Sequence, residues 1–274
     1  MPTPMIRNLL SIAVIASALS GCGSAPLQAS QPRASAGATS ARTPSTSGET
    51  PTANAPAPIG WKLSDIPAFP PAPAAIPVQP TPGPSAPFLA RIPTRQRVAF
   101  LTIDDGFVKT AEAPKLIAAA HIPVTLFLTV NAVRDNPAYF AAMQANGAVI
   151  EAHTITHTEL RGRSYAVQRR EICGSADKLG QWYHRRPVLF RPPFGDKDAT
   201  TLRVVHECGM NAALFWKETV DKGKVRYQEG HTVQPGDIIL MHFRPAFVKD
   251  FLAALQAIHR AGLIPALLED YLPR

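Results

Sequence analysis

Short apolar runs alternate with longer amphipathic segments from about residue 95 to the end of the chain. The apolar runs are rich in Val, Ile, Leu and Phe and predict buried strands. We place these strands at residues 98–106, 122–130, 148–152, 188–190, 210–216, 237–243 and 263–267. Helices are predicted between them at residues 114–120, 136–146, 164–183, 198–208 and 247–261. Because mostly apolar strands alternate with helices, the pattern predicts a parallel sheet wrapped by helices, as a barrel or near-barrel.

The pattern is absent from residues 23–90, which contain 15 of the 28 prolines together with many Ala, Ser and Thr residues. A segment of this composition cannot bury enough apolar surface to offset the entropy of ordering it. We therefore predict a disordered tether over residues 22–90 and a single folded domain over residues 91–274.

The amino terminus is typical of a targeting segment. Arg7 is followed by an apolar run at residues 9–19, which is too short to span a bilayer as a mature helix. The run ends in Leu-Ser-Gly-Cys at residues 19–22, which resembles the lipobox of bacterial lipoproteins. The resemblance implies a signal peptide at residues 1–21, lipidation of Cys22 and a domain anchored to the outer face of the cell membrane. The alternative is an ordinary secretory signal with a chance cysteine.

The chain has a formal net charge of +8 and a pI near 9.7, which raises the possibility of nucleic-acid binding. The predicted export argues against it, as does the lack of aromatic residues interleaved with the arginine pairs at 169–170 and 185–186. No nucleic-acid partner is expected. A basic surface suits anionic envelope polymers or lipids, although solvated arginines account for the charge equally well.

Cys173 and Cys208 remain once Cys22 is assigned to the lipid, and both lie in predicted helices. An oxidising exterior permits a disulfide between them. Two buried thiols are the alternative, since free cysteine behaves as a small hydrophobic residue. Separation along the chain does not decide between the two, because it does not report distance in space.

Candidate chemistry is concentrated at the ends of two predicted strands. Asp104 and Asp105 end the first strand, and the carboxyl end of a buried strand is where α/β folds place their chemistry. His153 and His157 follow the strand at 148–152 with the spacing of metal ligands, and one helical turn would place both rings on one face. Two histidines with a carboxylate leave metal positions open for water and substrate, as in catalytic sites. A solvated Asp-Asp-Gly turn and a surface histidine pair are the alternatives.

Four motifs occur in the order found in the polysaccharide deacetylase (NodB-like, carbohydrate esterase family 4) domain, which this chain resembles. T-I-D-D-G at residues 102–106 resembles its T-F-D-D-G motif, and H-T-I-T-H at 153–157 resembles its H-[S/T]-x-x-H motif. R-P-P-F-G at 191–195 and L-M-H at 240–242 match two later motifs. The resemblance implies an α/β fold with a distorted (β/α) barrel.

The resemblance also implies roles for individual residues. Asp105, His153 and His157 would bind a divalent metal, with zinc expected and other divalent ions possible in the family. Asp104 would be the general base that takes a proton from the attacking water. The expected substrate is an N-acetylated glycan.

The remaining implied roles surround this centre. Arg191 would pair with Asp104 and keep it ionised. The backbone N–H near Phe194 would stabilise the oxyanion, with Pro193 and Trp216 beside the substrate. His242 would protonate the departing amine.

The chain departs from the family pattern at three places. Ile103 replaces the usual Phe, and Phe107 stands where Pro is common. The D-x-x-D-W motif, whose Asp orients the catalytic His, is absent from residues 215–221. Glu218 or Asp221 could replace that Asp as the partner of His242, or His242 could have no carboxylate partner.

These observations favour a metal-dependent N-deacetylase of an envelope polysaccharide, with peptidoglycan as the first candidate. An O-acetyl esterase, a hydrolase of a non-sugar amide and a catalytically weakened glycan-binding lipoprotein are the alternatives.

Overall fold

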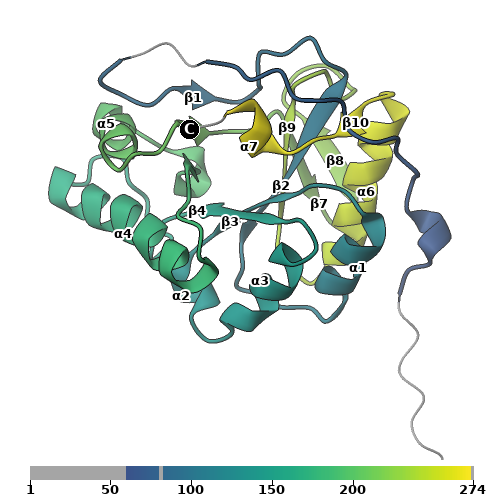
Figure 1. Ribbon diagram of the computed structural model, residues 1–274, viewed down its shortest axis with the longest axis horizontal. Helices are drawn as coiled ribbons and strands as arrows, with labels where there is room; N and C mark the ends of the chain where they lie inside the picture. The colour runs from purple at the N-terminus through teal and green to yellow at the C-terminus, as the bar shows by residue number, and fades with distance from the viewer. Residues whose placement is uncertain (1–59, 80–82, 273–274) are drawn as a thin grey trace, which may run out of the picture. The chain divides into compact units, whose positions relative to one another are not determined.

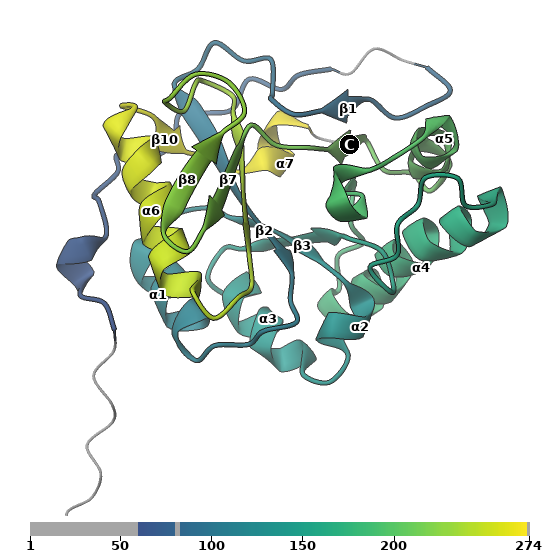
Figure 2. The same ribbon diagram turned by 180° about the vertical axis from the view of Figure 1, so that it is seen from behind.

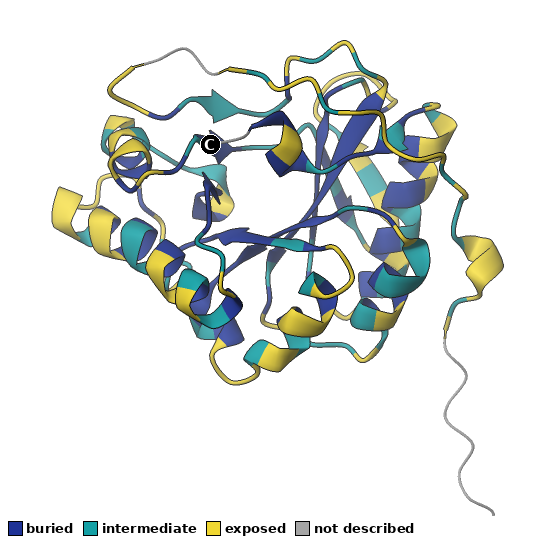
Figure 3. Cartoon of the chain, viewed as in Figure 1, coloured by how far each residue is buried: buried dark blue, intermediate teal, exposed yellow. Residues whose placement is uncertain are grey.

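Strand β2 (Val98–Asp105) lies at the centre of the sheet, and its sequence V-A-F-L-T-I-D-D is buried along nearly its whole length (Figures 1 and 3). It pairs in parallel with β3 (Thr125–Leu128) on one side and with β9 (Ile238–His242) on the other. The computed structural model describes residues 60–79 and 83–272. Among these residues, no helix is both long and apolar enough to cross a membrane.

The strands follow one another in the order β1-β6-β5-β4-β3-β2-β9-β7-β8, and β10 pairs with the start of β2. Every pair within the sheet is parallel except the β7–β8 hairpin. The remaining strands are β1 (Phe88–Leu89), β4 (Val149–Ala152), β5 (Leu189–Phe190), β6 (Ala212–Leu214), β7 (Glu218–Asp221), β8 (Lys224–Tyr227) and β10 (Ile264–Pro265). The curled sheet with its helices is a distorted (β/α) barrel, which confirms the predicted fold class.

The helices are α1 (Glu112–Ala120), α2 (Val130–Val133), α3 (Pro137–Gln144), α4 (Tyr165–Tyr183), α5 (Ala199–Glu207), α6 (Phe247–Arg260) and α7 (Leu268–Tyr271). Helices α1, α3, α4, α5 and α6 lie outside the curled sheet, as Figure 2 shows from the back, whereas α7 packs against the inner side of β2 through Tyr271. Short 3-10 turns occur at η1 (Leu63–Asp65) and η2 (Pro193–Gly195). Every predicted strand and helix has a counterpart here, with its ends shifted by a few residues.

Alternation along the strands divides the core into two parts. Ala99, Leu101 and Ile103 of β2 pack in the large apolar cluster between sheet and helices. Val98 and Phe100 point the other way, into a smaller cluster inside the curve of the sheet. Because successive side chains of a strand alternate in direction, Asp104 belongs to this inner face, where a carboxylate needs a polar partner.

The β7–β8 hairpin was not predicted. Polar residues occupy three of the four positions of β7 and alternate positions of β8, so the apolar run that indicates a buried strand is missing. The turn between them uses Lys222 and Gly223, both with positive φ (53° and 75°), as a tight hairpin turn requires. This hairpin lies next to β9 and extends the sheet on that side.

The domain begins earlier than the boundary predicted at residue 91. Trp61, Ile66 and Phe69 pack against the large apolar cluster, and the Val78 N–H donates a 2.8 Å hydrogen bond to the Tyr271 carbonyl. Strand β1 pairs with β6 at the edge of the sheet. Extended backbone and an edge position are compatible with proline, so a proline-rich composition does not prevent this segment from docking. Cys22 and the predicted signal peptide lie outside the described residues.

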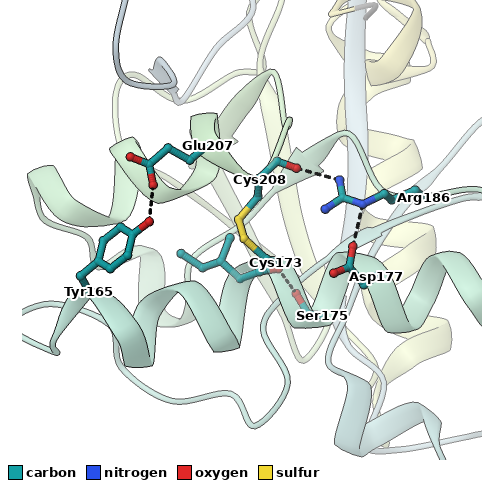
Figure 4. Close-up of a disulfide and its surroundings, with 8 residues drawn as sticks. Tyr165, Cys173, Ser175, Asp177, Arg186, Glu207 and Cys208 are labelled. Atoms are coloured by element: carbon teal, nitrogen blue, oxygen red, sulfur yellow. Dashed lines mark hydrogen bonds and ion pairs between the residues drawn. A yellow bond between two sulfur atoms is a disulfide. The ribbon is translucent and has the colours of Figure 1, made fainter.

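Cys173 of α4 and Cys208, which follows α5, form a disulfide with their Cα atoms 5.2 Å apart (Figure 4). Of the two alternatives for these cysteines, the structure has the bridge. Arg186 donates a hydrogen bond to the Cys208 carbonyl and pairs with Asp177 of α4. The bridge and these contacts join α4 to α5.

Candidate active site

The two carboxylates that end β2 point in different directions. Asp104 continues the inner face of the strand and is almost fully buried. Asp105 has a φ of 79°, so the backbone leaves the strand at this residue and the side chain is partly exposed. Gly106 follows with a φ of 98°, and a Cβ there would lie 2.9 Å from the Phe140 ring. Only glycine satisfies both requirements without strain.

Arg191 follows β5 and lies inside the barrel with no exposed side-chain surface. Its Nη1 atom donates to Asp104 Oδ1 at 2.7 Å and to Thr102 Oγ1 at 2.8 Å. The Nη2 atom donates to the Phe215 carbonyl at 3.1 Å, and the guanidinium lies over the Phe127 ring at 4.3 Å. The predicted Asp104–Arg191 pair is therefore present.

His153 and His157 lie on a loop rather than on the helical turn that the spacing suggested. Thr154 and His157 both have positive φ (67° and 60°), which excludes a regular helix. The Thr154 hydroxyl accepts a 3.0 Å hydrogen bond from the His157 N–H and closes the loop. The His153 Nδ1 atom lies 2.7 Å from the Arg191 carbonyl. Because a carbonyl only accepts, Nδ1 carries a proton, and Nε2 is the nitrogen that faces Asp105 and could bind a metal.

The three predicted ligands are brought together. The Nε2 atoms of His153 and His157 lie 3.5 and 3.2 Å from Asp105 Oδ1, and the prospective donor atoms lie within 4.8 Å of one another. Burial opposes ionisation, but the two imidazoles hold the pKa of Asp105 well below its usual value. Asp105 Oδ1 is buried without a hydrogen-bond partner. Two imidazoles, one carboxylate and an orphaned oxygen fit a divalent ion such as Zn²⁺.

Glu171 of α4 holds the histidine loop and was not identified from the sequence. Its Oε2 atom accepts from the Ile155 N–H at 3.1 Å, from the Thr156 N–H at 2.9 Å and from the Thr156 hydroxyl at 3.1 Å. Glu171 lies beside Ile172 on the buried face of α4. The sequence did contain a signal for this role, namely a carboxylate on the apolar face of a helix. A buried carboxylate is stable only with hydrogen-bond partners, so such a position predicts a contact of this kind.

The loop after β5 forms the mouth of the site. Phe194 has a φ of 61°, and its exposed ring lies edge-on to His157 with the ring centroids 4.9 Å apart. Gly195 (φ 70°) packs so tightly that a Cβ would lie 2.1 Å from the Phe215 ring. Trp216 stacks on Phe215 with the centroids 4.1 Å apart. The hydrogen bonds of this turn use the N–H groups of Gly195 and Asp196, which leaves the Phe194 N–H for a ligand.

His242 ends β9 directly beside Asp104, its partner in the β2–β9 register. Its Nδ1 atom is buried and has no hydrogen-bond partner among the described residues. Burial lowers the pKa of His242 and Arg244 lowers it further, against the opposing effect of Asp104 and Asp105.

Neither candidate partner of His242 is bonded to it. Glu218 pairs with Ile239 in the register and therefore lies on the opposite face of the sheet, near Asp237. Asp221 lies on the same face as His242, but its Oδ1 atom pairs with Arg244 Nη1 at 3.3 Å. The structure thus leaves His242 without a carboxylate partner within its described residues.

These groups line one cavity of about 360 Å³. It contains Asp104, the three prospective metal ligands and His242, with Phe194 and Trp216 at its sides. Pro193 is buried beneath the Phe194 loop. The structure thus brings the predicted residues Asp104, Asp105, His153 and His157 to one cavity, whereas Glu171 behind the histidine loop was not predicted.

The chain is similar to known proteins over most of its described part. Residues 91–213 match the model of the polysaccharide deacetylase family. An uncharacterized protein of Streptomyces coelicolor is 38% identical over 194 residues, which are 68% of this chain and 77% of that protein. The peptidoglycan-N-acetylmuramic acid deacetylase of Bacillus subtilis is 24% identical over 162 residues, which are 54% of this chain and 61% of that protein.

Solved structures show the same fold. A mutant with restored activity of a carbohydrate esterase family 4 pseudoenzyme, whose wild type comes from Bacillus anthracis, superposes with a TM-score of 0.60. It is 18% identical and covers 69% of this chain and 72% of its own. The family match includes Asp104, Asp105, His153, His157 and Arg191 and ends before β7 and His242.

Proposed function

Because the chain belongs to the polysaccharide deacetylase family of hydrolases, we propose that it removes N-acetyl groups from an envelope polysaccharide in a metal-dependent reaction. The observation that carries this proposal is the position of the Asp105–His153–His157 cluster beside the buried Asp104–Arg191 pair in one cavity. Amide hydrolysis needs an activated water, a base and stabilisation of an oxyanion. The cavity offers groups for all three.

Asp105, His153 and His157 would hold the metal. A divalent ion at this position supplies Lewis acidity to the acetyl carbonyl and to an attacking water. The chain orients these ligands through contacts behind them, namely the Arg191 carbonyl behind His153 and the Glu171 carboxylate behind the histidine loop. Such outer contacts fix the tautomer and the direction of each imidazole.

Asp104 acts as the base that accepts the proton of the attacking water. The 2.7 Å hydrogen bond from Arg191 occupies Asp104 Oδ1, which leaves Oδ2 to accept the proton. The Phe194 N–H would donate a hydrogen bond to the developing oxyanion. His242 delivers a proton to the departing amine. Acetate and a free amino sugar are the products.

The favoured substrate is peptidoglycan, because the predicted lipid anchor would keep the enzyme at the envelope of its own cell. We propose that Cys22 carries this lipid and that the segment after it links the domain to the membrane. In the native host, the wild type is expected in the membrane fraction and the Cys22→Ser variant in the soluble exported fraction. Equal partitioning of the two proteins would exclude a lipid at Cys22.

Acetate release tests the proposed reaction. The protein is stripped with a chelator, reloaded with Zn²⁺ or another divalent ion, and assayed on N-acetylglucosamine oligomers, on purified peptidoglycan and on an O-acetylated xylan. We expect acetate from an N-acetylated glycan, loss of activity with the chelator and recovery with metal. Acetate from the xylan alone would identify an O-acetyl esterase instead.

The unpartnered Nδ1 of His242 supports a second candidate, a glycan-binding protein with weakened catalysis. Metal-loaded protein that binds the glycan without releasing acetate from any substrate would establish this second function and reject the first.

A further inference from the structure

The β7–β8 hairpin forms a wall of the cavity that the catalytic scheme does not use. Thr219 of β7 pairs with Leu240 of β9 on one side and with Arg226 of β8 on the other. Residues that face each other across paired strands share a face of the sheet. Thr219, Leu240 and Arg226 all line the cavity, so this wall reaches from His242 outward to the guanidinium of Arg226.

Packing and hydrogen bonding fix the backbone of the hairpin that carries Arg226. Val225 and Tyr227, on the other face of β8, pack against the large apolar cluster. The Gly223 N–H in the turn donates a 2.6 Å hydrogen bond to Asp250 of α6. Side chains carried on a packed strand keep their direction better than side chains on a free loop.

Two guanidinium groups line this wall. Arg244 pairs with Asp221, so these two charges offset each other. Arg226 has no hydrogen-bond or ion-pair partner anywhere in residues 60–79 and 83–272, and its side chain is exposed at the cavity. The wall therefore presents one uncompensated positive charge near the end of β9.

A guanidinium matches a carboxylate better than it matches a neutral sugar. Its parallel N–H groups donate two hydrogen bonds to the two carboxylate oxygens, and the charge strengthens both. A neutral N-acetylhexosamine offers hydroxyl and amide groups, which do not require a cation. The metal-ligand cluster and Arg226 line the same cavity of about 360 Å³. A sugar whose acetamide lies at the cluster therefore also has the ring substituent next to the acetamide inside this cavity.

On the basis of the deacetylase function proposed above, we infer that the enzyme selects an N-acetyl sugar with a carboxylate beside the acetamide, and that Arg226 binds this carboxylate. N-acetylmuramic acid, with its lactyl group next to the acetamide, is a sugar of this kind. Arg244 lines the same wall, but its charge is offset by Asp221, so Arg226 is the cation that meets the carboxylate.

The test compares two glycans that differ only in this charge. One is a peptide-free glycan strand with free lactyl carboxylates, and the other is the same strand with the carboxylates converted to methyl amides. For the metal-loaded wild type we expect kcat/KM for acetate release to be about tenfold higher on the acid, the range of one charge-assisted contact. Arg226→Gln should reduce this ratio to about one through a higher KM for the acid, because bound carboxylate loses its cation.

Arg260→Gln is the matched control, since it removes one exposed positive charge at the end of α6 and outside the cavity. It should keep the wild-type ratio. Equal rates of the wild type on acid and amide would overturn the inference, and so would an unchanged ratio in Arg226→Gln.

Binding separates this inference from the proposed reaction. The Asp104→Asn variant, which lacks the base, is titrated by calorimetry with the acid and amide forms of a short oligomer. Tighter binding of the acid, lost in the Asp104→Asn/Arg226→Gln double variant, supports the inference even if the wild type releases no acetate. Equal binding of the two forms contradicts it, whereas failure of acetate release alone rejects only the deacetylase function.

Discussion

The two sides of the cavity differ in how completely their polar groups are paired. On the base and metal side, Asp104 is bonded to Arg191, His153 to the Arg191 carbonyl, and the histidine loop to Glu171. On the acid side, His242 Nδ1 has no hydrogen-bond partner among the described residues. The family match covers the first side and ends before the second.

This difference shows which side of the reaction the fold prepares in advance. Preorganised groups aimed at a developing charge do not need to reorganise during the reaction. Asp104 meets this condition, because its guanidinium partner is itself held by Thr102 and by the Phe215 carbonyl. The backbone of His242 is fixed in β9, but among the described residues its Nδ1 atom has no hydrogen-bond partner. We therefore expect substitutions on the first side to have the larger effects.

The largest effect is expected from Asp104→Asn. An amide cannot accept the proton of the attacking water, so acetate release should fall by roughly 10²–10⁴-fold, the usual contribution of a general base. Asp270→Asn is the matched control, an exposed carboxylate of α7 that should leave the rate at the wild-type value. Metal content and thermal unfolding are measured for both variants. An Asp104→Asn enzyme with full activity and bound metal would remove Asp104 from the role of base.

A smaller effect is expected from substitution of Glu171, which supports the loop that carries His153 and His157. Glu171→Ala removes the acceptor of three hydrogen bonds from Ile155 and Thr156, so the histidine loop loses its support. Metal affinity should fall by roughly 10–100-fold, as for other outer contacts of metal ligands. Glu171→Gln keeps an acceptor oxygen and should recover part of the affinity. Titration with a competing chelator measures both variants, and unchanged affinity in Glu171→Ala would show that the loop is held without this residue.

Loss of the Asp221 carboxylate, which lies on the same face of the sheet as His242, should have little effect on the rate of acetate release. Asp221 pairs with Arg244 and not with His242, so Asp221→Ala should change acetate release from neutral N-acetylglucosamine oligomers by less than about threefold, an effect of altered positioning only. A pH–rate profile adds a second measurement, because a true partner of His242 would raise the pKa of its imidazole. A fall of a hundredfold with a shifted acid limb would show that Asp221 orients His242 during the reaction and would weaken the contrast between the two sides.

The sequence predicted most of the paired side, because all of its residues except Glu171 of α4 lie in short motifs at the ends of apolar strands. The Asp104–Asp105 pair, the His153–His157 pair and Arg191 lie far apart along the chain, but a parallel sheet brings the carboxyl ends of its strands to one edge. The spacing of His153 and His157 also suits a helical turn, but the structure has a loop with positive φ there, because ligand spacing alone does not distinguish the two.

The unpaired side could not be predicted in the same way. The hairpin strands are half polar, so their alternation does not stand out from a loop. The partners of Glu218 and Asp221 depend on which face of the sheet each side chain occupies, and a shift of one residue in register reverses that assignment. The segment before β1 was missed for a related reason, since a few anchors such as Trp61 and Phe69 dock it without any apolar period.

The smallest effect on acetate release is expected from Glu218→Gln, which should leave the rate unchanged, because Glu218 lies on the face of β7 away from the cavity. Stability should change instead. Burial, and then the neighbouring Asp237 carboxylate, raise the pKa of Glu218 to about 9. The folded state therefore keeps a proton that the unfolded chain loses above its ordinary carboxyl pKa of about 4.3.

Since the folded state binds more protons between these two values, the wild type should lose stability as the pH rises from about 4.5 toward 9. Glutamine is neutral at every pH and can donate to Asp237 in place of the protonated carboxyl. Near pH 4.5 the variant and the wild type should have the same free energy of unfolding. At pH 8 the free energy of unfolding of the variant should be higher by at least about 1 kcal/mol, as measured by urea unfolding at both pH values. If the difference in free energy of unfolding between the two proteins is the same at pH 4.5 and pH 8, Glu218 does not retain its proton in the folded state. A large loss of activity in the same variant would place Glu218 behind His242 after all and would give the acid side the partner that the structure does not show.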